Sequence, residues 1–149
     1  MENLFTAYFD VEPQSCELLS GSGSNRRYFR LSAEGRSCMG VIGTDARENN
    51  AFIRLSEHFR SKGINVPQVY AVSEDGMTYI QEDLGSRMLS DDVTAALKEG
   101  GYFPESPVVE LLCRTMSKLP TIQFKGAEGL DFSKCYPSES FDLRMVKWD

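Results

Sequence analysis

The chain has 149 residues, of which 41% are apolar, so it is long enough to form one ordinary domain with a hydrophobic core. Its 16 basic and 22 acidic residues give a net charge of −6, which disfavours general nucleic-acid binding. It has no run of about 18 apolar residues, and its start, MENLFTAYFD, lacks a basic segment followed by an apolar one. We therefore expect a cytoplasmic protein without a membrane partner.

The placement of charges and cysteines indicates which ligands and cross-links to expect. Residues 21–62 contain eight basic and four acidic side chains, a basic island in an acidic chain that suits one small anionic ligand. The cysteines form no CxxC pair, and His58 is the only histidine. We therefore expect neither a zinc site nor a disulfide framework, but reduced, mostly buried thiols at Cys16, Cys38, Cys113 and Cys135.

The first third of the chain predicts a helix and three strands. Leu4, Phe5, Tyr8 and Phe9 have the spacing of a short amphipathic helix. The segment QSCELLSGSGSNRRYFRLS predicts a strand, a glycine turn and a second strand, and residues 37–42 predict a third strand after the turn AEGR. Period-two alternation in the second arm places one set of side chains, Arg26, Tyr28 and Arg30, opposite another, Arg27, Phe29 and Leu31.

The clearest predicted helix covers residues 45–62. Asp45 can cap it with Glu48 at the third helical position, and Gly63 followed by Pro67 ends it. Its apolar stripe consists of Phe52, Leu55 and Phe59. The segment VYAVSEDGMTYIQ then predicts two strands around the turn Ser-Glu-Asp-Gly, and the second strand ends in EDLG.

Helices and loops follow Gly85. Asp91 and Asp92 suit the first turn of a helix through Lys98, and the pair Ser106-Pro107 opens another. A polar, glycine-containing stretch covers residues 125–137, and SFDLRMVKWD begins an amphipathic helix that stops on its apolar face, so we expect a fragment of a longer protein. The predicted fold class is α+β, with an antiparallel sheet of about five strands, one long helix after the third strand, and a helical tail.

Three segments, in this order and at this spacing, resemble the N-terminal lobe of aminoglycoside phosphotransferase-like kinases, in the amino-sugar kinase branch of the protein-kinase-like fold. They are LLSGSGSNRRYFRL, RENNAFIRLSEHFRSKGINVPQVY and YIQEDLG, and the resemblance covers roughly residues 18–119. It implies a nucleotide-binding N-lobe over residues 1–85 and the start of an incomplete C-lobe over 86–149. It also implies ATP as the nucleotide and Mg²⁺ held by the missing lobe.

The resemblance assigns binding roles to two segments. The glycine loop would cradle phosphates with backbone N–H groups, since side chains at Gly21 and Gly23 would obstruct that approach, and with the small donors of Ser22, Ser24 and Asn25. The strand exit would hold adenine through backbone groups of Glu82, Asp83 or Leu84. Taken alone, the first segment is equally an exposed hairpin turn and the second an ordinary acidic strand end.

The sequence departs from the family in two ways. The strand-three segment CMGVIG has no lysine to contact phosphates and pair with a helix glutamate. Glu48 matches that glutamate, although a capping box explains it equally well, and we expect Arg27 or Arg30 to replace the lysine. The chain also lacks the H-x-D motif and the later metal aspartate, so these residues should catalyse nothing alone.

The expected function is therefore the ATP-binding part of a small-molecule kinase that phosphorylates a hydroxyl, as on a sugar or amino sugar. Three alternatives stay open. They are a pseudokinase or regulatory nucleotide-binding module, because of the absent lysine, an RNA-binding module, because arginines and aromatics interleave in RRYFR, and an α+β domain without a ligand. The sequence leaves the acceptor and the oligomeric state undetermined.

Overall fold

The computed structural model describes residues 1–20, 25–98 and 107–140. It divides the chain into two compact units. One joins Met1–Asp83 to the segment that begins at Gly129, and the other is Leu84–Glu128. The sequence-based boundary at residue 85 stays a prediction.

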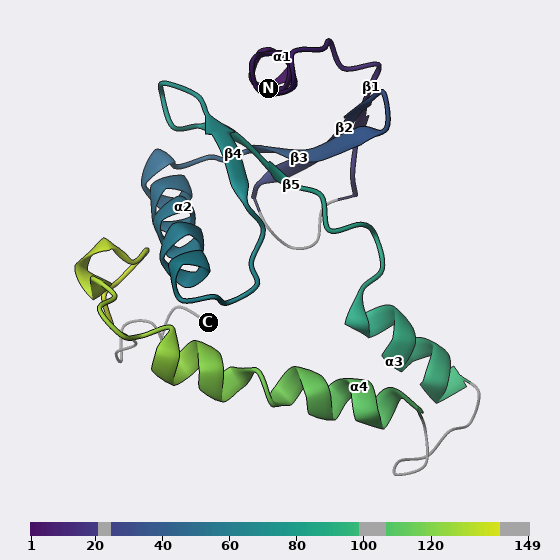
Figure 1. The fold of residues 1–149 in the computed structure, drawn as a ribbon, viewed down its shortest axis with the longest axis vertical. Coiled ribbons are helices and arrows are strands. Elements are labelled where there is room, and N and C mark those ends of the chain that lie inside the picture. The colour runs from purple at the N-terminus through teal and green to yellow at the C-terminus, as the bar shows by residue number, and fades with distance from the viewer. Residues whose placement is uncertain (21–24, 99–106, 141–149) are drawn as a thin grey trace. The chain divides into compact units, whose positions relative to one another are not determined.

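The first unit is built on a five-stranded antiparallel sheet (Figure 1). Its spatial order is β1-β2-β3-β5-β4, so β5 lies between β3 and β4. The predicted α+β class and the five antiparallel strands are confirmed. The strands are β1 (Ser15–Leu18), β2 (Arg27–Ala33), β3 (Arg36–Ile42), β4 (Val69–Val72) and β5 (Thr78–Glu82).

Of the three predicted turns between strands, the glycine turn before β2 falls on residues 21–24, outside the described residues, and the other two form, each with a glycine of positive φ. Glu34 and Gly35 join β2 to β3 with φ values of 52° and 74°, which is the backbone of a two-residue turn that matches strand twist. Gly76, with φ of 69°, lies in the turn between β4 and β5, where the Asp75 carboxylate accepts hydrogen bonds from Ser73 and Met77. These turns set the strand register locally.

Helix α1 (Glu2–Phe9) packs on one face of the sheet. Phe5 is fully buried there, in a core with Leu31, Ala33, Cys38 and Ile80. Because side chains alternate along β2, Arg27 and Phe29 belong to the same face as Leu31. Phe29 packs against this core.

Helix α2 (Ala46–Ser61) packs on the opposite face, where Phe52 stacks on Tyr79 of β5 with ring centroids 5.5 Å apart. The predicted cap is confirmed, since the Asp45 carboxylate accepts a hydrogen bond from the Arg47 backbone N–H at 2.8 Å. Gly63, with φ of 70°, follows the helix as predicted. The sheet is thus enclosed between two helices, and its α2-facing side carries Tyr28 and Arg30.

The second unit contains α3 (Leu89–Lys98), α4 (Pro107–Met116) and a π-helical turn (Thr121–Lys125). Helix α3 has Asp91 and Asp92 in its first turn, as predicted, and none of its residues is buried. Ser106, the predicted N-cap, is not among the described residues. The helix predicted over residues 140–149 also lies outside them, except for Ser140. None of the helices in the described ranges combines the length and apolarity that crossing a membrane requires.

The expectation of mostly buried thiols is wrong for two cysteines. Cys38 is buried in the core, and burial raises the pKa of its thiol to about 12. Cys135 is half-buried, but Cys16 and Cys113 are exposed. Cys16 lies on the outermost strand β1, whose four residues are all exposed, so a small apolar residue there gains no cover.

Candidate functional site

The predicted phosphate loop lies almost wholly outside the described residues. Gly21, Ser22, Gly23 and Ser24 are not described, whereas Asn25 is exposed and immediately precedes the arginine-rich arm. Arg27, one of the two arginines expected to replace the lysine, is exposed and lies 5.9 Å from the ring of Phe29. It is therefore on the α1 side of the sheet, opposite the face that carries α2.

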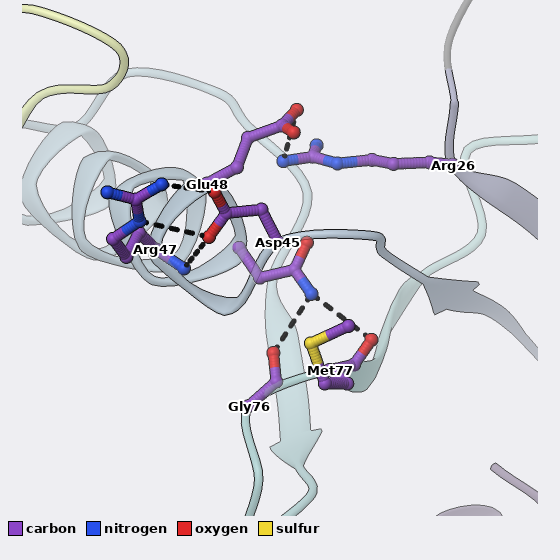
Figure 2. Close-up of polar contacts among 7 residues, drawn as sticks. Arg26, Asp45, Arg47, Glu48, Gly76 and Met77 are labelled. Carbon is purple, nitrogen blue, oxygen red and sulfur yellow. Dashed lines mark hydrogen bonds and ion pairs between the residues drawn. The ribbon is translucent and has the colours of Figure 1, made fainter.

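Glu48 pairs with Arg26, whereas Arg27 or Arg30 was expected from the sequence to supply the cation. The Arg26 Nη2 atom lies 3.0 Å from Glu48 Oε1 (Figure 2). The Arg26 side chain is only 10% exposed, and its guanidinium lies 5.4 Å from the ring centroid of Phe52. A helix glutamate thus holds a cation on the α2-facing side of the sheet, one residue after the glycine-rich segment.

Arg30 is committed to a different carboxylate. Its Nε and Nη2 atoms donate to the two oxygens of Asp83 at 2.8 and 3.2 Å, a two-point contact that joins β2 to the end of β5. The Asp83 side chain is 7% exposed, and the Asp83 carboxylate raises the pKa of Arg30. The sequence singled out both residues, but for contacts with nucleotide rather than with each other.

At the exit of β5, Glu82 and Leu84 differ in their backbone hydrogen bonds. The Glu82 backbone N–H donates to the Gln68 carbonyl at 2.8 Å, and its carboxylate accepts from the Gln68 N–H at 3.1 Å. In the described part of the chain, the Leu84 backbone N–H and C=O have no hydrogen-bond partner. Gly85 follows with φ of 86°, a turn that favours glycine. Leu84 therefore offers the donor and acceptor that backbone recognition of a base needs.

Two contacts fix the start of α2, which carries Glu48. Arg47 donates to both oxygens of Asp45 at 3.2 and 2.8 Å, and these hydrogen bonds hold the Asp45 pKa at about 2 (Figure 2). Asn49 is fully buried and donates from Nδ2 to the carbonyls of Gly76 and Met77 at 2.9 and 3.1 Å. The helix is thus attached to the turn between β4 and β5, a contact that the sequence pattern did not signal.

Gly43 leaves the space that the Asn49 side-chain amide occupies. A Cβ atom at Gly43 would overlap the Asn49 side-chain amide, so a residue without a side chain is required between β3 and α2. The Gly43 N–H also donates to the Met77 carbonyl at 2.9 Å. The orientation of Glu48 therefore depends on a buried amide and a glycine.

A separate cavity of about 360 Å³ lies between α2 and residues 129–135 of the same unit. His58 lines it, and none of the predicted site residues does. The described residues contain no group of three or more histidine, cysteine or acidic side chains that could hold a metal ion. We therefore assign no Mg²⁺ ligand to them.

The described geometry thus consists of a cation held by a helix glutamate, a carboxylate-bound arginine beside the strand exit, and a backbone donor and acceptor at Leu84. No protein-family model matches the chain, and no curated protein matches it.

Proposed function

We propose that this chain is the nucleotide-binding part of an ATP-dependent small-molecule kinase of the aminoglycoside phosphotransferase-like type. The observation that carries the proposal is the Arg26–Glu48 ion pair on the α2-facing side of the sheet. In the kinases that the sequence resembles, a lysine and a helix glutamate form the corresponding pair. Here an arginine supplies the cation from the arm that follows the glycine-rich segment.

Arginine is chemically suited to this role. A guanidinium carries five N–H donors in a planar fork, so it can hold a carboxylate and a phosphate oxygen at the same time. Glu48 restricts the directions that the guanidinium can take, which lowers the entropy lost when a phosphate binds. Arg26 therefore replaces Arg27 and Arg30 as our candidate for the phosphate-binding residue.

The other two arginines have different positions. Arg27 lies on the α1 side of the sheet, and Arg30 already binds Asp83 at two points. Moving Arg30 to a phosphate would leave the mostly buried Asp83 carboxylate without that cation, which is costly. We keep Gly21, Ser22, Gly23, Ser24 and Asn25 as the proposed phosphate loop, and Leu84 as the proposed contact to adenine.

The alternative of RNA binding is less well supported. An RNA-binding sheet surface needs aromatic rings exposed beside cations on one face. In this chain Phe29 packs against the α1 core, while Arg26 lies against α2. The RRYFR segment therefore divides its side chains between the two faces of the sheet.

The proposed reaction in the whole protein is transfer of the ATP γ-phosphoryl group to a hydroxyl of a small substrate such as a sugar or amino sugar. This chain supplies contacts that orient the nucleotide and balance its charge. Because it carries no H-x-D motif, we expect it to bind nucleotide weakly and to transfer no phosphoryl group. A pseudokinase would bind nucleotide equally well and would differ only in lacking these groups in its second lobe.

The test is calorimetric titration of the 149-residue chain with Mg-ATP. We expect saturable binding that weakens roughly tenfold or more in Arg26→Gln and in Glu48→Gln, because a charge-assisted hydrogen bond to phosphate is lost or misdirected. Arg36→Gln is the control, since Arg36 is exposed and donates to the Phe9 carbonyl, away from Glu48. Absence of binding, or equal weakening in the control, would refute the proposal.

A further inference from the structure

The Arg30–Asp83 pair connects two strands that are not neighbours. Arg30 lies opposite Met39 of β3, and Met39 lies opposite Gln81 of β5. Asp83 is two residues beyond Gln81, so by alternation it points to the same face of the sheet as Arg30. The ion pair therefore extends across β3 on the side that α2 covers.

The geometry of this pair restricts motion more than a surface ion pair does. Arg30 contacts both carboxylate oxygens, and the side chains are only 27% and 7% exposed. A two-point contact between a planar guanidinium and a planar carboxylate fixes orientation as well as distance. By contrast, the Arg47–Asp45 pair has an arginine that is 81% exposed, and such pairs restrain little.

Asp83 lies where the chain leaves β5, so its ion pair with Arg30 affects the residues that follow the strand. β5 ends at Glu82, so Asp83 is the first residue that the strand no longer includes. Leu84 and Gly85 follow, and Leu84 has no backbone hydrogen bond within the described part of the chain. Arg30 therefore anchors the chain immediately before the residue that we propose as the base contact.

We infer that Arg30 and Asp83 form a positioning pair that holds the Leu84 backbone ready to bind the base of a nucleotide. This inference rests on the proposed function. It assigns Arg30 no direct contact with phosphate, and it separates two tasks along one strand arm: Arg26 acts on the phosphates and Arg30 acts on the base through Asp83. It also explains why a β2 residue and a strand-exit residue are joined across an intervening strand.

The two tasks predict different ligand dependence. Loss of the Arg30–Asp83 pair should weaken binding of a ligand that has a base and leave binding of a bare polyphosphate unchanged. Loss of the Arg26–Glu48 pair should weaken both. Inorganic tripolyphosphate with Mg²⁺ is the probe without a base, and Mg-ATP is the probe with one.

The experiment measures affinity for both probes in the wild-type chain, Arg30→Gln, Asp83→Asn, the double variant and Arg36→Gln as control. We expect the Mg-ATP affinity of each single variant to fall roughly tenfold, with tripolyphosphate affinity within about twofold of wild type. The double variant should lose no more than the worse single variant, because both act through one contact. Arg30→Lys should recover only part of the affinity, since an ammonium makes a single-point contact.

A second measurement tests the pair without nucleotide. Hydrogen exchange of the Glu82 amide, which donates to the Gln68 carbonyl immediately before Asp83, should be roughly tenfold faster in Arg30→Gln than in wild type, while amides of β3 are unchanged. Unchanged exchange at Glu82, or equal loss of Mg-ATP and tripolyphosphate affinity, would overturn the inference. If wild type binds neither probe but exchange at Glu82 still responds to Arg30→Gln, the proposed function fails and the anchoring of the end of β5 by the pair survives.

Discussion

Arg26, Arg27 and Arg30 are close together in the sequence but contact different parts of the fold. Alternation correctly separated Arg27 from Arg30, because neighbouring residues of a strand point to opposite faces. It could not tell which cation meets Glu48, since that depends on the distance between the start of β2 and the first turn of α2. Arg26 precedes the strand and reaches the helix, whereas Arg30, four residues along, reaches the end of β5.

Asn49 shows how a single polar residue can decide the placement of a helix. It is fully buried, and its Nδ2 group satisfies two carbonyl oxygens of the β4–β5 turn. A buried donor to two carbonyls has no replacement among apolar side chains, because both carbonyls would then lose this donor. Asn49 and Asn50 are adjacent and identical in sequence, yet Asn50 is exposed.

The substitution Asn49→Asp should therefore destabilise the first unit by about 3 kcal/mol at pH 7, because a buried carboxylate would face two carbonyl oxygens. Asn50→Asp is the matched control and should change stability by less than about 0.5 kcal/mol. Urea unfolding followed by far-ultraviolet circular dichroism measures both. Equal stability of the two variants would show that Asn49 does not attach α2 to the turn.

At the scale of elements, the two helices that enclose the sheet differ in how well their patterns predicted their contacts. The apolar spacing of residues 4–9 predicted α1, and Phe5 is the residue that it buries fully. For α2 the predicted stripe included Leu55, but the buried residues of the helix are Asn49, Ala51 and Ser56. Asn49 and Ser56 lie about one helical turn before and after Phe52, so two polar side chains belong to the buried side of a helix whose predicted stripe was entirely apolar.

Helix α1 should depend on Phe5 for its attachment. Phe5→Ala removes a fully buried ring from the core of Leu31, Cys38 and Ile80, and we expect a loss of about 3 to 5 kcal/mol in the free energy of unfolding. Phe132→Ala makes the same chemical change at a side chain that is 49% exposed in the same unit. Its expected effect is less than about 1 kcal/mol, so similar unfolding midpoints for the two variants would contradict the packing described here.

At the scale of the whole molecule, the two compact units differ in how much of their structure is buried. β2, β3 and β5 each contain fully or almost fully buried side chains, whereas α3 contains none. Local stability follows buried apolar contact, so the sheet and the second unit should open independently.

Hydrogen exchange of the intact chain can measure this difference. Amides in the centre of β3 should exchange at least roughly a hundredfold more slowly than those of α3, after correction for intrinsic rates. The α2 amides that follow Asn49 provide an internal reference, because this helix packs on the sheet. Equal protection of α3 and β3 would mean that both units unfold as one cooperative body.

The sequence by itself determined the elements of the first unit: the strands, the glycine turns, the long helix with its Asp45 cap and the α+β class. These features follow from side-chain period, φ preference and capping, which act over a few residues. It also marked Glu48, Arg30 and Asp83 as candidate site residues. Only the tertiary structure decided that Glu48 meets Arg26, that Arg30 meets Asp83 across β3, and that Asn49 joins α2 to a distant turn. Those pairings depend on sheet order and helix placement, which bring together side chains separated by 22 to 53 positions in the chain.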